Sequence, residues 1–360
     1  MKQIACIVGA RPNFIKMAAL LEEIRQRESL RALLIHTGQH SSREMSARFF
    51  EDLRLPTPDV FLGISGGTGT QQTARIMEQL EATFAARRPD LVLVVGDVNS
   101  TLAAAIVAAQ AGIPLAHVEA GLRSGDRRMP EEVNRVMTDA ISDFLFTSEA
   151  GAEACLLREG VAPERIHFAG NVMIDTLLRF REEAAGSAVL ETLALTPRAY
   201  AVATLHRPSN VDDALQLERL LRMLERLQER LPVVFPVHPR TRQRMAAAGL
   251  WTTVQLVEPL GYLDFLRLTS EARLVLTDSG GIQEETTILQ VPCLTLRENT
   301  ERPATITHGT NQLVGTDPEN ALRAAYAILD GPLVHRHGPD RWDGQAAKRV
   351  LDVLEPALCG

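Results

Sequence analysis

The stretch Leu274-Val275-Leu276-Thr277-Asp278-Ser279-Gly280-Gly281-Ile282-Gln283-Glu284-Glu285 passes from a short apolar run through a polar, glycine-containing turn into a helix-forming segment. The apolar run has the length and residue types of a buried parallel strand. Ser279 can cap the following helix, and Gly280 and Gly281 let backbone N–H groups approach an anion because no Cβ stands between them. The stretch therefore predicts a phosphate-binding turn. The alternative is an ordinary strand-to-helix turn.

Two glutamates, Glu284 and Glu285, follow one turn into this predicted helix. A carboxylate beside a phosphate would repel it. We therefore place this pair at an uncharged part of the same ligand, such as ribose hydroxyls, as acidic residues do in nucleotide sites. The alternative is a pair of surface glutamates.

Outward from this stretch, short apolar runs alternate with amphipathic helical segments, which is typical of parallel strands joined by crossover helices. Across 360 residues, two domains of roughly 150 to 200 residues are expected. The pattern breaks at 184–197, which we interpret as a linker between domains at 1–183 and 198–340. The expected fold is α/β, with two Rossmann-like, doubly wound parallel-sheet domains. The expected strands are 4–8, 33–36, 91–95, 114–118, 144–146, 165–168, 200–204, 233–236, 254–257, 274–277 and 293–296.

The composition excludes several functional classes. A net charge of -7 and an aromatic content of 4% argue against nucleic-acid binding. The longest apolar runs, such as 91–95, are far shorter than a membrane span, and the first residues enter a strand pattern directly, so we expect a cytoplasmic protein without a membrane partner. The four cysteines are scattered singly and are interpreted as reduced thiols.

In doubly wound sheets, ligands bind beyond the carboxyl ends of the strands, so the residues there are the ones to inspect. After the first strand, Arg11 and Lys16 flank Pro12 at a predicted helix start, where two cations and the helix dipole suit a diphosphate. Two solvated surface cations are the alternative. Neither Gly-x-Gly-x-x-Gly nor a Walker motif is present, so no dinucleotide cofactor is expected.

Carboxylates follow the next strand ends. Asp97 comes after 91–95 and Glu119 after 114–118, and partial burial at a strand mouth makes such groups usable as acids or bases. Glu131 and Glu132 open a later helix, and we interpret Glu132 as a complement to the helix dipole. His117, inside a strand, is more typical of a core histidine than of a catalytic one.

In the second half, His206 and His238 each follow a strand, but they are far apart in sequence and lack supporting ligands, so no metal site is expected. Arg302 is either a structural ion pair or an anion clamp. The candidates on both halves therefore predict one cleft between the domains; they are Asp97, Glu119, Glu131, His206, Ser279, Glu285 and Arg302.

These segments together resemble the non-hydrolysing UDP-N-acetylglucosamine 2-epimerases over nearly the whole chain. Each motif is short, but their ordered series is specific. The motifs are Gly9-Ala10-Arg11-Pro12 with Lys16, Gly96-Asp97, His117 to Arg123, Pro130-Glu131-Glu132, His206-Arg207, Thr277 to Glu285, Thr300-Glu301-Arg302-Pro303 and Asp343-Gly344-Gln345.

The resemblance implies a glycosyltransferase-B-like fold in which 198–340 binds UDP and a final helix at about 344–354 returns to the first domain, so that 344–360 joins 1–183. It also implies a homodimer, a UDP-sugar as partner, and no metal or other cofactor. The implied catalytic residues are Asp97, Glu119, Glu131 and His206. The implied substrate-binding residues are Arg11, Lys16, Asp97, Glu119, His206, Phe265, Ser279, Gly280, Gly281, Glu285 on the ribose, and Arg302.

The implied reaction inverts C-2 of UDP-N-acetylglucosamine to give UDP-N-acetylmannosamine. The C-2 proton is not acidified by a carbonyl, so UDP must leave C-1 as that proton is removed, which gives a 2-acetamidoglucal to which UDP adds back. The proton leaves one face and returns to the other. Several carboxylates at one site fit this demand, and which carboxylate serves which face stays open.

Some residues depart from the commoner family pattern, notably Pro208-Ser209, Leu260-Gly261 and Arg127-Arg128. The basic pair could meet a sugar carboxylate, so a 2-epimerase of UDP-2,3-diacetamido-2,3-dideoxyglucuronic acid is an alternative; the pair could equally be solvated. Gln39-His40 leaves open a regulatory second substrate site. Further alternatives are a UDP-sugar glycosyltransferase, a hydrolysing epimerase and a non-catalytic nucleotide-sugar binder.

Overall fold

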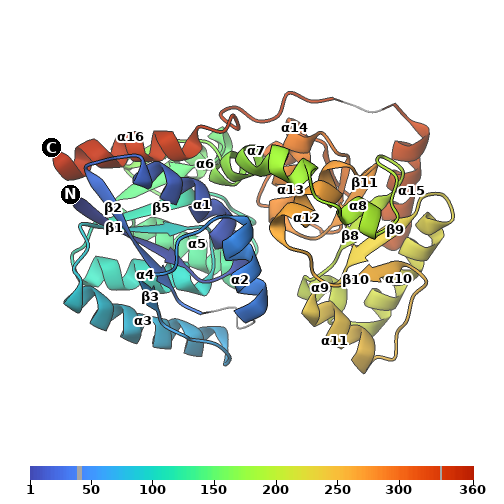
Figure 1. The fold of residues 1–360 in the computed structure, drawn as a ribbon, viewed down its shortest axis with the longest axis horizontal. Helices are drawn as coiled ribbons and strands as arrows, with labels where there is room; N and C mark the ends of the chain where they lie inside the picture. The colour runs from blue at the N-terminus through green and yellow to red at the C-terminus, as the bar shows by residue number, and fades with distance from the viewer. Residues whose placement is uncertain (39–42, 333–334) are drawn as a thin grey trace. The chain divides into compact units, whose positions relative to one another are not determined.

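The computed structural model describes residues 1–38, 43–332 and 335–360, so Gln39 and His40 lie outside it. Contacts divide the chain into unit 1, Met1–Arg179 with Asp340–Gly360, and unit 2, Phe180–Pro339. The first boundary falls within helix α7 (Val172–Ala185), before the expected linker. Each unit has its own parallel sheet (Figure 1), which confirms two doubly wound α/β domains.

Unit 1 contains a seven-stranded sheet in the order β3-β2-β1-β4-β5-β6-β7, with every neighbouring pair parallel. Leu91–Val95 is buried throughout, as expected for a strand covered on both faces. The strands are β1 (Lys2–Val8), β2 (Leu30–His36), β3 (Val60–Phe61), β4 (Leu91–Val95), β5 (Leu115–Ala120), β6 (Phe144–Thr147) and β7 (Ile166–Phe168). The order reverses between β1 and β4, which defines the switch point where ligands bind in such sheets.

Besides α7, unit 1 contains α1 (Arg11–Arg25), α2 (Arg43–Asp52), α3 (Gly69–Ala86), α4 (Asn99–Gln110), α5 (Pro130–Ile141), α6 (Ala150–Arg158), the 3-10 turn Pro163–Arg165 and α16 (Ala346–Cys359). Helix α4 is almost wholly buried because its side chains are mostly small and apolar, and it packs against α3 and α5. This packing places the N-terminus of α5 beside the switch point.

The C-terminal helix α16 belongs to unit 1 and packs on α1 (Figure 1). Arg27 follows α1 and forms ion pairs with Asp352 at 2.6 Å and Glu355 at 2.7 Å. At the other end, the Ala347 N–H donates to Asp175 at 2.7 Å, which satisfies a backbone donor in the first turn of α16.

Unit 2 contains a six-stranded parallel sheet in the order β10-β9-β8-β11-β12-β13, which again reverses in the middle, between β8 and β11. Leucines of α10 and α15 pack with strand residues of this sheet in one apolar cluster. The strands are β8 (Ala201–Thr204), β9 (Val233–Pro236), β10 (Gln255–Val257), β11 (Leu274–Thr277), β12 (Cys293–Thr295) and β13 (Asn311–Leu313). The helices are α8 (Val189–Thr192), α9 (Pro208–Val211), α10 (Ala214–Gln228), α11 (Pro239–Ala247), α12 (Tyr262–Ser270), α13 (Gly280–Leu289), α14 (Ala304–Thr307) and α15 (Pro318–Asp330).

Two strands were not predicted from the sequence. Both β3 and β13 lie at the edge of a sheet and have two or three residues, too few for an apolar pattern to stand out. Within the described ranges, no helix is both long and apolar enough to span a bilayer. The four cysteines, two of them buried, form no disulfide.

Candidate active site

The candidate residues of unit 1 lie at the carboxyl ends of the strands around its switch point. Lys16, on the second turn of α1, forms an ion pair with Glu119, with Nζ and Oε2 2.5 Å apart. Both side chains are only 3% exposed. Lys16 is therefore not a solvated surface cation, and because removing one member of a buried pair leaves an unpaired charge, the two are strongly dependent on each other.

Glu119 has an unusual backbone. Its φ is +75° and it lies where the register between β5 and β6 shifts, between Val118 and Ala120. A residue with a Cβ adopts positive φ only at an energetic cost, and such strain is concentrated at functional sites. The bulge turns the side chain of Glu119 toward Lys16.

Gly96 separates β4 from Asp97 and has a φ of +67°. A Cβ at this position would lie 3.1 Å from Lys16 Nζ and 3.6 Å from Glu119 Oε1. Glycine is therefore required twice here, once for the backbone conformation and once for the space that the ion pair occupies.

Asp97 is bound to a residue that the sequence analysis did not select. Its carboxylate pairs with Arg135 of α5, whose side chain is 1% exposed, and its backbone carbonyl accepts from Asn134 Nδ2 at 2.8 Å. Arg135 also contacts Glu132 at 2.9 Å. The only signal in the sequence was the spacing of Glu132 and Arg135 on one helix face.

Glu132 was expected only to complement the helix dipole, but it also makes several hydrogen bonds. Its carboxylate accepts the N–H of Ser124 and of Gly125, each at 2.9 Å, as well as Arg135. Burial acts to raise the pKa of Glu132, but these donors more than offset it and the pKa is lowered. The side chain of Glu132 is buried, and its hydrogen bonds anchor the loop before α5.

Two further candidates lie nearby in unit 1. Glu131 is half-buried in the first turn of α5. The same helix holds Asp97 through Arg135. Arg11, the first residue of α1, lies 5.7 Å above the ring of Phe49, and burial lowers its pKa. The turns after β1, β4 and β5 and the start of α5 thus bring carboxylates and cations together.

In unit 2, His206 follows β8 and pairs with Asp278 at the end of β11, with Nδ1 and Oδ1 2.7 Å apart. Asp278 also accepts the N–H of His206 and of Arg207, both at 2.9 Å. Burial acts to raise the pKa of Asp278, but His206 and these donors lower it to about 2. The carboxylate therefore orients the ring and leaves Nε2 of the half-buried imidazole for a ligand.

Asp278 lies in the stretch 274–285, but its local sequence did not predict a role at the site. Ser279, beside it, occupies the N-cap position of α13, but its hydroxyl makes no capping hydrogen bond, contrary to expectation. The turn is instead closed by the Ser279 N–H, which donates to Thr277 Oγ1 at 3.0 Å. The hydroxyl of Ser279 is thus not committed to the helix end.

Gly280 and Gly281 open α13 as expected, and Gly280 has a specific reason to be glycine. A Cβ there would lie 2.5 Å from Arg302 Nη1. Arg302 is buried and forms ion pairs with Glu301 and, at 3.0 Å, with Glu284. The ion pair is therefore present, and binding of an anion by Arg302 stays a prediction.

More arginines surround the same carboxylates. Arg297 lies 2.7 Å and Arg207 3.8 Å from Glu301. Together with Arg302, three guanidinium groups lie beside two buried carboxylates, and Asp278, one residue before the N-cap of α13, adds a third carboxylate. Cations beside a helix N-terminus would suit an anion.

Glu285 differs from its neighbour Glu284. It is 5% exposed, and its carboxyl has no hydrogen bond or ion pair to any residue that the structure describes. Burial, with a smaller contribution from Glu284, raises the pKa of Glu285 to about 8. Glu285 is therefore largely protonated at neutral pH. Phe265 is half-buried on α12, which packs on α13.

His206 and His238 lie close together, but they have no third ligand among the described residues. The rings of His206 and His238 are 5.6 Å apart, and His238 Nδ1 accepts the Arg240 N–H at the start of α11. Over residues 1–38, 43–332 and 335–360, no three His, Cys, Asp or Glu side chains gather as a metal site would require.

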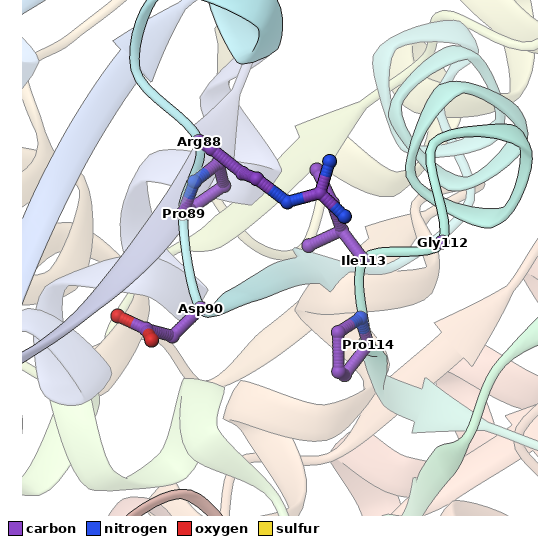
Figure 2. A pocket seen from close by; sticks show the side chains of 6 residues that line it. All are labelled: Arg88, Pro89, Asp90, Gly112, Ile113 and Pro114. Atoms are coloured by element: carbon purple, nitrogen blue, oxygen red, sulfur yellow. The ribbon is translucent and has the colours of Figure 1, made fainter.

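A surface hollow of about 280 Å³ lies elsewhere in unit 1 (Figure 2). It is lined by Arg88, Pro89, Asp90, Gly112, Ile113 and Pro114, the residues just before β4 and β5. This is the amino end of the sheet, opposite the edge that carries Asp97 and Glu119. The hollow is therefore separate from the candidate site.

The chain is similar to known proteins over almost its whole length. The family model described as UDP-N-acetylglucosamine 2-epimerase matches residues 22–355. A UDP-N-acetylglucosamine 2-epimerase of Methanococcus maripaludis is 40% identical, with 98% of each chain covered. A UDP-2,3-diacetamido-2,3-dideoxy-D-glucuronate 2-epimerase of Pseudomonas aeruginosa is also 40% identical, covering 98% of this chain and 99% of the relative.

Among solved structures, a crystal structure of Methanocaldococcus jannaschii UDP-GlcNAc 2-epimerase in complex with UDP-GlcNAc and UDP matches with a TM-score of 0.92 at 38% identity. The match covers 98% of this chain and 99% of that one. The similarity thus spans both units. This chain belongs to the UDP-N-acetylglucosamine 2-epimerase family.

Proposed function

We propose that this protein is an isomerase that inverts C-2 of UDP-N-acetylglucosamine to give UDP-N-acetylmannosamine without hydrolysing the substrate. One observation carries the proposal. Asp97 and Glu119 stand at the carboxyl ends of adjacent parallel strands, each held by a buried cation, at the switch point of unit 1. The names of the relatives support the same reaction.

The reaction proceeds by elimination and re-addition. A carboxylate takes the C-2 proton as the bond between C-1 and the UDP oxygen breaks, and a double bond forms between C-1 and C-2. A proton then reaches the opposite face of C-2 while the UDP oxygen attacks C-1 again. We propose Asp97 and Glu119 for proton transfer at the sugar, with Glu131 assisting, each contributing about 10² to 10⁴-fold.

UDP is assigned to unit 2. The first turn of α13, with Ser279, Gly280 and Gly281, and the guanidinium of Arg302 would stabilise charge on the departing diphosphate. His206 Nε2 would meet the same group. Glu285 would bind the ribose hydroxyls and Phe265 would contribute an apolar contact.

Unit 1 would add positive charge to the same step. Arg11 lies at the N-terminus of α1, and Lys16 lies one turn further on, next to Glu119.

The uronic acid substrate is a second candidate because of the loop before α5. Arg127 and Arg128 are both exposed, but Arg128 forms an ion pair with Asp126 at 2.8 Å. Arg127 is therefore the cation of this pair better suited to meet a sugar carboxylate. Comparing kcat/KM for the two UDP-sugars in wild type and Arg127→Gln tests this: loss confined to the uronic acid supports it, and equal values refute it.

The experiment that tests the main proposal is proton NMR of UDP-N-acetylglucosamine with the protein in heavy water, without an acceptor. The expected result is deuterium at C-2 of both sugars together with the manno epimer, all lost in Asp97→Asn. Free N-acetylmannosamine with UDP would instead identify a hydrolysing enzyme. Binding of UDP without exchange would identify a non-catalytic protein, and turnover only with an acceptor would identify a glycosyltransferase.

We also propose that the protein is a cytoplasmic homodimer. Helix α5 exposes Val133, Met137 and Ile141, which are spaced four residues apart and so share one face of the helix. Covering this apolar stripe in a second copy would remove it from water. Light scattering should give the mass of a dimer for wild type and of a monomer for Met137→Glu; a wild-type monomer would refute the proposal.

A further inference from the structure

We propose that the buried pair formed by His117 and Asp139 positions the two carboxylates Asp97 and Glu119 for proton transfer. Neither residue is assigned to the substrate; both act through the backbone that carries the carboxylates. The inference rests on the function proposed above, since it concerns the geometry of the groups assigned there.

Asp139, on α5, binds the segment that contains Glu119 on both of its flanks. Its Oδ1 lies 2.6 Å from His117 Nδ1, two residues before Glu119. Its Oδ2 accepts the N–H of Gly121, two residues after Glu119, at 3.0 Å, and lies 2.7 Å from Arg123 Nη2. One carboxylate thus meets three donors from a single bulged strand end.

These bonds oppose a specific strain. The positive φ of Glu119 costs about 1 to 2 kcal/mol relative to ordinary strand conformation. Such a conformation persists only where the surroundings over-determine it. If the flanking bonds to Asp139 were lost, relaxation of the bulge would move the Glu119 carboxylate away from Lys16.

His117 extends the same network to Asp97. Its Nε2 lies 2.8 Å from the carbonyl oxygen of Gly96, the residue before Asp97, and the ring is completely buried. Both ring nitrogens therefore lie within hydrogen-bond distance of an oxygen. One imidazole ring on β5 therefore links the turn after β4 to Asp139, which in turn binds the turn after β5.

The ionisation of Asp139 supports this arrangement. Burial acts to raise the pKa of Asp139, but His117 and Arg123 more than offset it, so the pKa lies below its usual value. An ionised carboxylate can accept from all three donors, whereas an asparagine amide offers only one oxygen.

The test compares His117→Ala, His117→Asn and His117→Gln. Asparagine places an amide nitrogen near the position of Nδ1, and glutamine places one near that of Nε2, so each keeps one of the two hydrogen bonds. We expect His117→Ala to lower kcat and the rate of C-2 deuterium exchange by about 10 to 100-fold, since a displacement of about 1 Å can have this effect. Asparagine and glutamine should recover part of the loss.

Binding of UDP supplies the readout that a general loss of structure would change. Most of the UDP contacts are assigned to unit 2, which carries neither His117 nor Asp139, so the dissociation constant for UDP should change far less than kcat. Glu159→Gln is the matched control. The Glu159 side chain is 39% exposed and contacts only the Arg123 end of the network, so this variant should keep kcat within about twofold of wild type.

Asp139→Asn and the double variant with His117→Gln complete the design. If the pair acts as a unit, the double variant should lose little more activity than the worse single one. Wild-type kcat in His117→Ala, or parallel losses of kcat and UDP binding in every variant, would overturn the positioning role. Absence of C-2 exchange in wild type would overturn the proposed function instead. Should His117→Ala not fold, the asparagine and glutamine variants carry the same comparison.

Discussion

Replacing Glu285 by Gln should stabilise the protein, and the gain should depend on pH. Glu285 is buried without a hydrogen-bond or ion-pair partner among the described residues, and its pKa is raised from 4.5 to about 8. Glutamine has nearly the same shape and never ionises. The substitution therefore removes the cost of a buried charge while leaving the packing of α13 unchanged.

The sign and size follow from proton linkage. Between pH 4.5 and 8 the folded state keeps a proton that the unfolded state has lost, so the free energy of unfolding falls as pH rises. The slope is at most about 1.4 kcal/mol per pH unit. Over this window the wild type loses on the order of 4 kcal/mol, and above pH 8 the loss is complete.

Urea unfolding of wild type and Glu285→Gln at several pH values between 5 and 9 measures the effect. The two proteins should be nearly equal at pH 5, and the variant should be more stable by several kcal/mol at pH 9. Contributions from other groups, such as Asp175 with a pKa of about 6, cancel in the difference.

Glu284→Gln is the matched control. It breaks a buried ion pair with Arg302 and should destabilise the protein throughout this range. A difference between wild type and Glu285→Gln that stays constant from pH 5 to 9 would refute the reasoning from burial. If Glu285 also binds ribose, the same variant should bind UDP more weakly in a titration, so stability and affinity should change in opposite directions.

Three further substitutions test the contacts of the site. Lys16→Met leaves Glu119 buried without its cation and should lower the free energy of unfolding by about 3 to 5 kcal/mol in denaturant titrations; an unchanged midpoint would contradict it. Gly96→Ala puts alanine at a positive φ and places a Cβ 3.1 Å from Lys16 Nζ. The free energy of unfolding should fall by about 1 to 2 kcal/mol, seen as a lower melting temperature, and turnover should be lost. Asp278→Asn removes the carboxylate that orients His206 and should lower kcat by about 10 to 100-fold while circular dichroism is retained; wild-type kcat would show that the ring needs no orientation.

The outcomes for single residues show where sequence reasoning reaches its limit. Leu91–Val95 was recognisable because its whole environment is apolar, whereas Val60–Phe61 pairs with one neighbour only at an edge and is too short to have a pattern. Ser279 could be placed at a helix start from local residue types. That its hydroxyl makes no capping bond depends on the geometry of the turn after β11.

The amino-acid sequence by itself determined the alternation of strands and helices, the two doubly wound domains and the strand ends that carry the chemistry, because these follow from periodicities over a few residues. Only the tertiary structure decided which charges meet. Lys16 and Glu119, or His206 and Asp278, come from distant parts of the chain, and their distances depend on strand order and register. The positive φ of Glu119, the pairing of Asp97 with Arg135 and the raised pKa of Glu285 arise from burial and long-range contact, which no local pattern encodes.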